Sequence, residues 1–129
     1  MIVIDCSAVV DALSLVEGTE ELCALLEAED LHAPALIDTE VVSALRGLTL
    51  GRHLTVPRAH DLLTDYDDLT LERWPTGDAL RRRAFALRDN LTAYDATYVA
   101  LAEALDCPLI TRDERLARTR GHHARIDVV

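Results

Sequence analysis

Four acidic residues stand where a folded chain would bring them together. Asp5 follows directly on the apolar run of residues 2–4, and Asp113 follows the short apolar run of residues 109–111. Both runs are typical of buried strands, and the carboxyl ends of parallel strands meet at one edge of a sheet. The sequence therefore predicts that Asp5 and Asp113 converge.

The other two acids, Glu40 and Asp95, fall on predicted helices. Glu40 lies in an apolar stripe of helical spacing, where a charge is costly unless it is paired or bound to a metal. A glutamate at the edge of such a stripe can also turn out to solvent. Asp95 comes three residues after Thr92, as in a capping box, so it has a purely structural interpretation too. The spacing leaves both interpretations open for each acid.

Carboxylates held close together repel one another unless a divalent cation neutralises them. Ligation by oxygen alone suits Mg²⁺ or Mn²⁺ rather than zinc. Such an ion lowers the pKa of a bound water and stabilises the charge that develops on a phosphodiester. Ser7 and Thr111 stand beside two of the acids, where they can support the carboxylates or orient water.

The pattern of apolar residues predicts the elements that position these acids. Strands are predicted over residues 2–5, 31–33, 69–72, 109–111 and 126–129. Helices are predicted over residues 7–15, 20–29, 34–48, 56–66, 76–88, 91–105 and 112–118, with Pro34 in a first turn and Thr111 as a cap. Because strands and helices alternate, we expect an α/β fold: a single domain, residues 1–129, with a mostly parallel central sheet flanked by helices on both faces.

Composition narrows the class of protein. The 129 residues suit one domain, and no run is long enough to cross a membrane. The N-terminus lacks the basic region of a signal peptide, so we expect a cytoplasmic protein. Residues 1–80 carry 16 acids and 4 arginines, whereas residues 81–129 carry 7 acids and 9 arginines. All 13 basic residues are arginine, which excludes any mechanism that needs a catalytic lysine.

Several segments resemble the motifs of PIN-domain nucleases. They are Ile2-Val3-Ile4-Asp5-Cys6-Ser7-Ala8, Tyr94-Asp95-Ala96-x-Tyr98-Val99-Ala100-Leu101-Ala102, Pro108-Leu109-Ile110-Thr111-x-Asp113-x-x-Leu116, and, less specifically, Glu40-Val41 with Ala44-Leu45. Their order, and the length of the chain, are similar to those of VapC-type toxins of type II toxin–antitoxin systems. The resemblance spans residues 1–116.

This resemblance implies a Mg²⁺-dependent endoribonuclease, with Mn²⁺ as a substitute, that hydrolyses RNA by metal-activated water. It assigns the catalytic, metal-binding role to four acids, Asp5, Glu40, Asp95 and Asp113. Ser7 and Thr111 fall at supporting polar positions. A cognate antitoxin would hold the enzyme inactive, DNA would be contacted only through that antitoxin, no membrane would be involved, and the protein would be a homodimer.

The main alternative is a catalytically silent PIN-fold module that acts through antitoxin binding and regulation of DNA. Loss of metal-dependent cleavage would distinguish it. A haloacid-dehalogenase-type phosphotransferase would need an acid in place of Ser7 and a lysine, and a receiver domain would also need a lysine, so both are excluded.

Two arginines are candidates for binding RNA. Arg112 and Arg115 are predicted to share a helical face that, with part of residues 81–83, contacts RNA phosphates. Ordinary surface charge is an equally good interpretation of these arginines.

Overall fold

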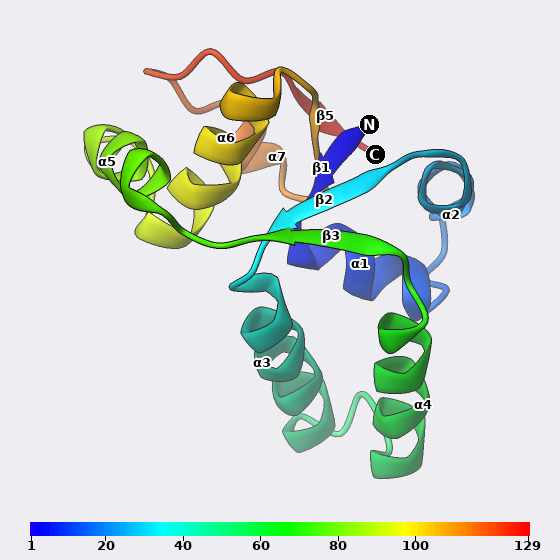
Figure 1. Cartoon of the computed structure of the whole chain (residues 1–129). Coiled ribbons are helices and arrows are strands. Elements are labelled where there is room, and N and C mark those ends of the chain that lie inside the picture. Colours follow the sequence, from blue (N-terminus) through cyan, green and yellow to red (C-terminus); the bar gives the residue numbers. More distant parts are fainter.

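The computed structural model describes residues 1–129, in which one or two helices follow each of the first four strands (Figure 1). The strands are β1 Ile2–Ile4, β2 Leu31–Pro34, β3 Leu71–Trp74, β4 Leu109–Thr111 and β5 Ile126–Val128. The helices are α1 Cys6–Leu13, α2 Glu20–Ala28, α3 Ile37–Leu50, α4 Val56–Asp67, α5 Asp78–Ala86, α6 Ala93–Leu105 and α7 Glu114–Ala117.

The five strands form one parallel sheet in the order β3-β2-β1-β4-β5. The first strand of the chain, β1, is therefore the central strand of the sheet, and all three of its residues are buried. A strand that is covered on both faces reads as a continuous apolar run, which is how β1 appears in the sequence. The predicted α/β class and parallel sheet are confirmed.

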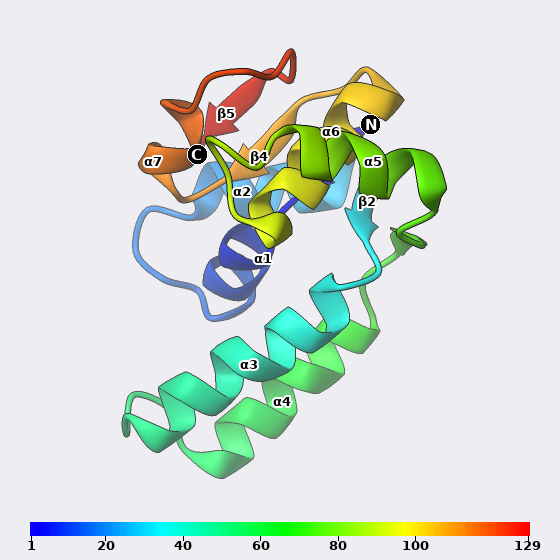
Figure 2. The same cartoon turned by 90° about the vertical axis from the view of Figure 1, so that its left-hand side faces the viewer.

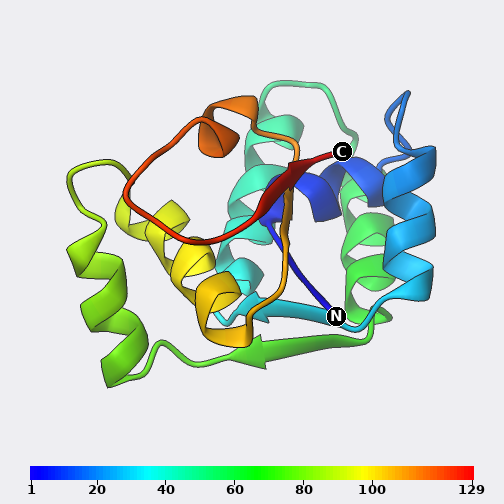
Figure 3. The ribbon, with the colours of Figure 1, turned by 90° about the horizontal axis from the view of Figure 1, so that it is seen from above.

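Helices cover both faces of the sheet. Helices α5 and α6 lie on one face, and α1, α2 and α4 lie on the other (Figure 3). Helix α6 has the longest buried stretch of any helix, with every residue from Ala96 to Ala102 buried, because it packs on β1, β2 and β4. One continuous cluster of 27 buried residues joins the two layers, as in a single domain. None of the helices is both long and apolar enough to span a bilayer.

Helices α3 and α4 form an antiparallel arm that projects from the sheet (Figure 2). The base of this arm is anchored at Asp38, in the first turn of α3. Its Oδ1 accepts hydrogen bonds from the hydroxyl of Tyr66 on α4 and from Nε of Arg73 on β3, each at 2.7 Å. These contacts fix the end of α3 that carries Glu40.

The predicted limits of one helix and one strand are wrong. Pro34 ends β2, opposite Trp74, and α3 begins only at Ile37. Proline suits a strand end as well as a first helical turn, because in both places its missing N–H is not needed. The predicted strand 69–72 lies at Leu71–Trp74, because Leu69 still donates to the carbonyl of Tyr66 at the end of α4.

The predicted cap of the last helix is also wrong. Helix α7 begins at Glu114, and its N-cap is Asp113, whose side chain accepts from the N–H of Arg115. The hydroxyl of Thr111 is bound to Asp5 instead. Arg112 therefore precedes the helix and does not share a helical face with Arg115.

Candidate active site

Asp5, Glu40, Asp95 and Asp113 line one cavity of about 380 Å³ near the carboxyl end of β1 and β4. They come from four separate places in the fold: the end of β1, the start of α3, the start of α6 and the turn before α7. Cys6, Ser7, Ser43, Ala44, Tyr98 and Leu116 complete the lining. The structure thus brings together all four acids that the sequence indicated.

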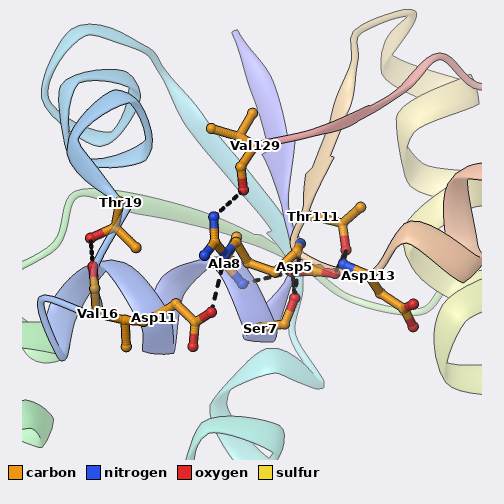
Figure 4. Close-up of polar contacts among 10 residues, drawn as sticks. Asp5, Ser7, Ala8, Asp11, Val16, Thr19, Thr111, Asp113 and Val129 are labelled. Atoms are coloured by element: carbon orange, nitrogen blue, oxygen red, sulfur yellow. Dashed lines mark hydrogen bonds and ion pairs between the residues drawn. The ribbon is translucent and has the colours of Figure 1, made fainter.

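Asp5 is the most buried of the four and the most tightly held. It is the N-cap of α1, and its Oδ1 accepts from the N–H of Ala8 at 2.9 Å and from the hydroxyl of Ser7 at 2.7 Å. Its Oδ2 accepts from the hydroxyl of Thr111 (Figure 4). Burial raises the pKa of the Asp5 carboxyl, although these three hydrogen bonds oppose the rise. Ser7 and Thr111 are therefore direct contacts of the first acid.

Glu40 faces the cavity rather than bulk solvent. Its Oε1 accepts a hydrogen bond of 2.7 Å from the hydroxyl of Tyr98 on α6. Burial, together with the nearby charges of Asp5 and Asp95, raises the pKa of this half-buried carboxyl. In the sequence, Tyr98 stands out only as part of the motif that begins at Tyr94. Its spacing of three residues from Asp95, which puts both on one face of a helix, was the signal for a place beside the acids.

Asp95 lies in the capped first turn of α6 and also lines the cavity. The side chain of Thr92 caps α6 by accepting from the N–H of Asp95 at 3.2 Å, while the Asp95 carboxylate lines the cavity. Burial raises the pKa of Asp95, and so does the charge of Asp113.

Asp113 differs from the other three acids because it already has a cationic partner. Its Oδ1 accepts from the backbone N–H of Arg115 at 2.9 Å, and its Oδ2 accepts from Nη2 of Arg115 at 3.2 Å. Arg115 lowers the pKa of Asp113, which is thus firmly ionised. The Asp113 carboxylate is directed away from Asp5 (Figure 4).

The side chains of the cavity offer the ligand atoms that a hard divalent cation prefers, but they do not lie close enough together to share one ion. The four acids offer only oxygen ligands, and three of them have raised pKa values in a shared negative environment. Burial raises the pKa of the neighbouring Cys6 thiol to about 12, so it offers no thiolate. No three acidic, histidine or cysteine side chains lie close enough to hold one ion in this arrangement.

Among the candidate RNA-binding arginines, Arg112 and Arg83 are held in structural contacts, whereas Arg115 is exposed beside the acids. The guanidinium of Arg112 donates to Oδ2 of Asp11 at 3.1 Å and to the carbonyl of Val129, so it joins α1 to the end of β5. Arg83 is held by Glu103 through two hydrogen bonds of 2.7 and 2.9 Å. The side chain of Arg115, in contrast, is 89% exposed and contacts only Asp113.

The model of the PIN-domain family matches residues 2–122 of this chain. The chain belongs to the PIN-domain family. Within that family it is similar to Ribonuclease VapC12 of Mycobacterium tuberculosis, with 37% identity over 129 residues that cover 100% of this chain and 99% of the relative. Ribonuclease VapC9 of the same species is 43% identical, over 100% of this chain and 98% of that protein. Such likeness over the whole length places the chain among the VapC ribonucleases.

Solved structures agree with this PIN fold. VapBC2 from Rickettsia felis, bound to a DNA fragment from its promoter, matches with a TM-score of 0.71 and 13% identity over 99% of this chain and 98% of that one. VapC20 of Mycobacterium tuberculosis, a toxin that cleaves the Sarcin-Ricin loop, matches with a TM-score of 0.65 and 12% identity over 91% of this chain and 93% of that one.

Proposed function

We propose that this VapC ribonuclease is a divalent-cation-dependent endoribonuclease and the toxin of a toxin–antitoxin pair. The observation that carries the proposal is the cavity in which four acids from four elements meet, in a chain whose relatives are ribonucleases over their full length. The PIN domain is proposed to extend over residues 1–129, because β5 completes the sheet beyond the matched residues 2–122.

Asp5, Glu40, Asp95 and Asp113 are proposed to hold one or two Mg²⁺ ions, with Mn²⁺ as a substitute. A divalent cation bound there supplies a water of lowered pKa and stabilises the charge that develops on the phosphodiester. Ser7 and Thr111 hold the carboxylate of Asp5 in place. The exposed Arg115 binds an RNA phosphate at the rim, whereas Arg112, whose guanidinium is engaged by Asp11 and Val129, is withdrawn from that role.

The partner is proposed to be a cognate antitoxin, through which the protein would contact DNA. Support comes from neighbours of the same fold that were solved as toxin–antitoxin complexes, two of them on DNA. The homodimer remains a prediction. Light scattering of the purified protein, with and without its antitoxin, measures both assemblies.

The test is cleavage of total RNA from the host by the purified, antitoxin-free protein, in Mg²⁺ and in EDTA. Asp95→Asn and the exposed Asp65→Asn are compared with the natural protein. We expect cleavage in Mg²⁺ only, lost in Asp95→Asn and retained in Asp65→Asn. Absence of cleavage by the folded, Mg²⁺-loaded protein would favour the catalytically silent, antitoxin-binding module. Equal cleavage by Asp95→Asn would contradict the assignment of the site.

A further inference from the structure

One aromatic side chain is exposed at the start of α6, beside an acid of the cavity. The chain has one Phe, one Trp and three Tyr, and two of the tyrosines, Tyr66 and Tyr98, are buried with their hydroxyls bound to carboxylates. Tyr94 differs from them, because 63% of it is exposed. It immediately precedes Asp95, in the first turn of the helix. Its ring is therefore available to a ligand that enters the cavity.

The geometry of α6 puts Tyr94 at the mouth of the cavity. Residues four apart lie on the same face of a helix, about 6 Å apart along its axis. Tyr98, four residues after Tyr94, lines the cavity, where its hydroxyl donates to Glu40. The helix is buried from residue 96 to residue 102 and exposed from residue 92 to residue 94, so this face passes from the cavity to solvent between the two tyrosines. Helical side chains also tilt towards the N-terminus, which directs the ring of Tyr94 outwards.

A cation lies near the same acid. Burial raises the pKa of Asp95, the charge of Asp113 raises it further, and the charge of Arg115 lowers it, so both charged groups act on Asp95. The side chain of Arg115 is exposed and contacts only Asp113. Arginines bind the phosphates of nucleic acids, and exposed aromatic rings stack on their bases. Asp95 thus has a group that suits a phosphate on a neighbouring element and a group that suits a base on its own helix.

We propose that Tyr94 binds the substrate by stacking on an unpaired base of RNA, and so holds the adjoining nucleotide beside the acids. The inference rests on the proposed ribonuclease, and it names the residue that binds a base there. A base that is free of a duplex can turn out onto an aromatic ring. Stacking tolerates all four bases, because each has a flat face. Tyr94 therefore contributes affinity and position without a strong preference for sequence.

The chain contains a matched control in Phe85. Phe85 is 69% exposed, but it lies on α5, which packs against α6 on the side away from α3 (Figure 3). Its ring already has a cationic neighbour, because Cζ of Arg88 lies 4.7 Å from the ring centroid. Tyr94→Leu and Phe85→Leu each remove one exposed ring and leave a residue that suits a helix. Only the first changes the mouth of the cavity.

The experiment measures binding to the full-length, antitoxin-free protein by fluorescence anisotropy, in EDTA so that no RNA is cut. One probe is a labelled single-stranded RNA of mixed sequence, about ten nucleotides long. The other has the same length and the same sugar–phosphate backbone but no bases. The natural protein should bind the RNA about tenfold more tightly than the abasic probe, as expected for one stacked base.

The variants should separate stacking from contacts with the backbone. Tyr94→Leu should lose most of the tenfold ratio, because it weakens binding of the RNA and leaves binding of the abasic probe unchanged. Tyr94→Trp, which keeps an aromatic ring, should retain the ratio. Phe85→Leu should have the affinities of the natural protein for both probes.

A ratio that Tyr94→Leu leaves unchanged would overturn the inference, and so would an equal loss of affinity for both probes or an equal effect of Phe85→Leu. An unchanged ratio together with a weaker antitoxin complex in light scattering would assign Tyr94 to a protein interface instead. Cleavage measured in parallel, in Mg²⁺, separates this inference from the proposed function. A ratio that depends on Tyr94, without cleavage by the natural protein, would support stacking while contradicting the nuclease. Cleavage with a ratio that does not depend on Tyr94 would do the reverse.

Discussion

Thr111, at the end of β4, donates the hydrogen bond of its hydroxyl to Oδ2 of Asp5, at the end of β1, across 106 residues of sequence. The register of the two strands pairs Ile4 with Ile110, so Asp5 and Thr111, the next residue after each of these, lie side by side. Thr111 is wholly buried, and its oxygen also accepts from the N–H of Asp113 at 3.0 Å. One hydroxyl therefore joins the segments that carry the first and the last acid.

We expect Thr111→Val to impair both stability and cleavage. Valine leaves the buried oxygen of Asp5 without this donor and the N–H of Asp113 without this acceptor. Loss of a hydrogen bond to a charged group should lower the free energy of unfolding by about 1.5–3 kcal/mol. Cleavage should fall by about 10- to 100-fold, as when a residue that orients a ligand is lost.

Urea denaturation and single-turnover cleavage measure the two effects of Thr111→Val. Thr97→Val is the control, because Thr97 is also buried but donates only to the carbonyl of Ala93, one turn earlier in α6. It should cleave RNA like the natural protein. If Thr111→Val also did so, Thr111 would have no supporting role.

The cluster of acids predicts a pH-dependent stabilisation by Mg²⁺. Burial raises the pKa values of Asp5, Glu40 and Asp95. An acid whose pKa is raised by folding adds stability below its ordinary pKa of about 4, and this stability is lost as the pH rises through the raised value. The free energy of unfolding is thus lower at neutral pH, where the three carboxylates are charged and repel one another, and a bound cation relieves this repulsion.

The measurement is the melting temperature in EDTA and in Mg²⁺ at a series of pH values. At a concentration about 100 times its Kd, Mg²⁺ should add about 2.7 kcal/mol to the free energy of unfolding at neutral pH, which appears as a higher melting temperature. The increment should shrink towards pH 4, where the acids are protonated. An increment that did not vary with pH would show that the ion binds elsewhere.

Asp95→Asn should be more stable than the natural protein in EDTA at neutral pH. The substitution removes one charge from a partly buried group of like charges, at the expense of activity. We expect the free energy of unfolding to rise by about 0.5–2 kcal/mol, the range that single stabilising substitutions commonly give. Asp65→Asn, at an exposed position on α4, should change the free energy of unfolding by less than about 0.5 kcal/mol. Equal effects of the two substitutions would contradict the cluster of repelling charges.

Arg115→Ala should affect RNA binding, whereas Arg112→Ala should affect stability. Arg115→Ala should weaken RNA binding and reduce the slope of log K against log salt by about 1, because it removes one phosphate contact. Arg112→Ala should leave that slope unchanged but lower stability by about 1–2 kcal/mol, since it releases Asp11 and the carbonyl of Val129. Fluorescence anisotropy with labelled RNA, over a salt series in EDTA, measures the slopes. A smaller slope for Arg112→Ala alone would restore that residue as the RNA contact.

The order of the elements and the convergence of Asp5 with Asp113 follow from local patterns in the sequence. The place of Glu40 and Asp95 beside them was indicated only by the resemblance to PIN-domain nucleases. An apolar run that ends in an acid predicts a strand and an acid at its edge, as for Asp5. The contacts that the sequence did not reveal are made between distant segments. Thr111 suits a helix cap locally, but Asp5 from across the sheet takes its hydroxyl. Arg112 fits a helical pattern, yet its partner at Val129 lies 17 residues further on.

The acids stand at residues 5, 40, 95 and 113, so the strand that starts the chain receives one of its two neighbours only near the end. A protein folds as it leaves the ribosome from its N-terminus. Until β4 has emerged, Asp5 has no hydroxyl from Thr111, and the turn that carries Asp113 does not yet exist. A nascent chain of this protein should therefore be unable to cleave RNA until the segment that carries β4 and Asp113 has emerged and β4 has paired with β1.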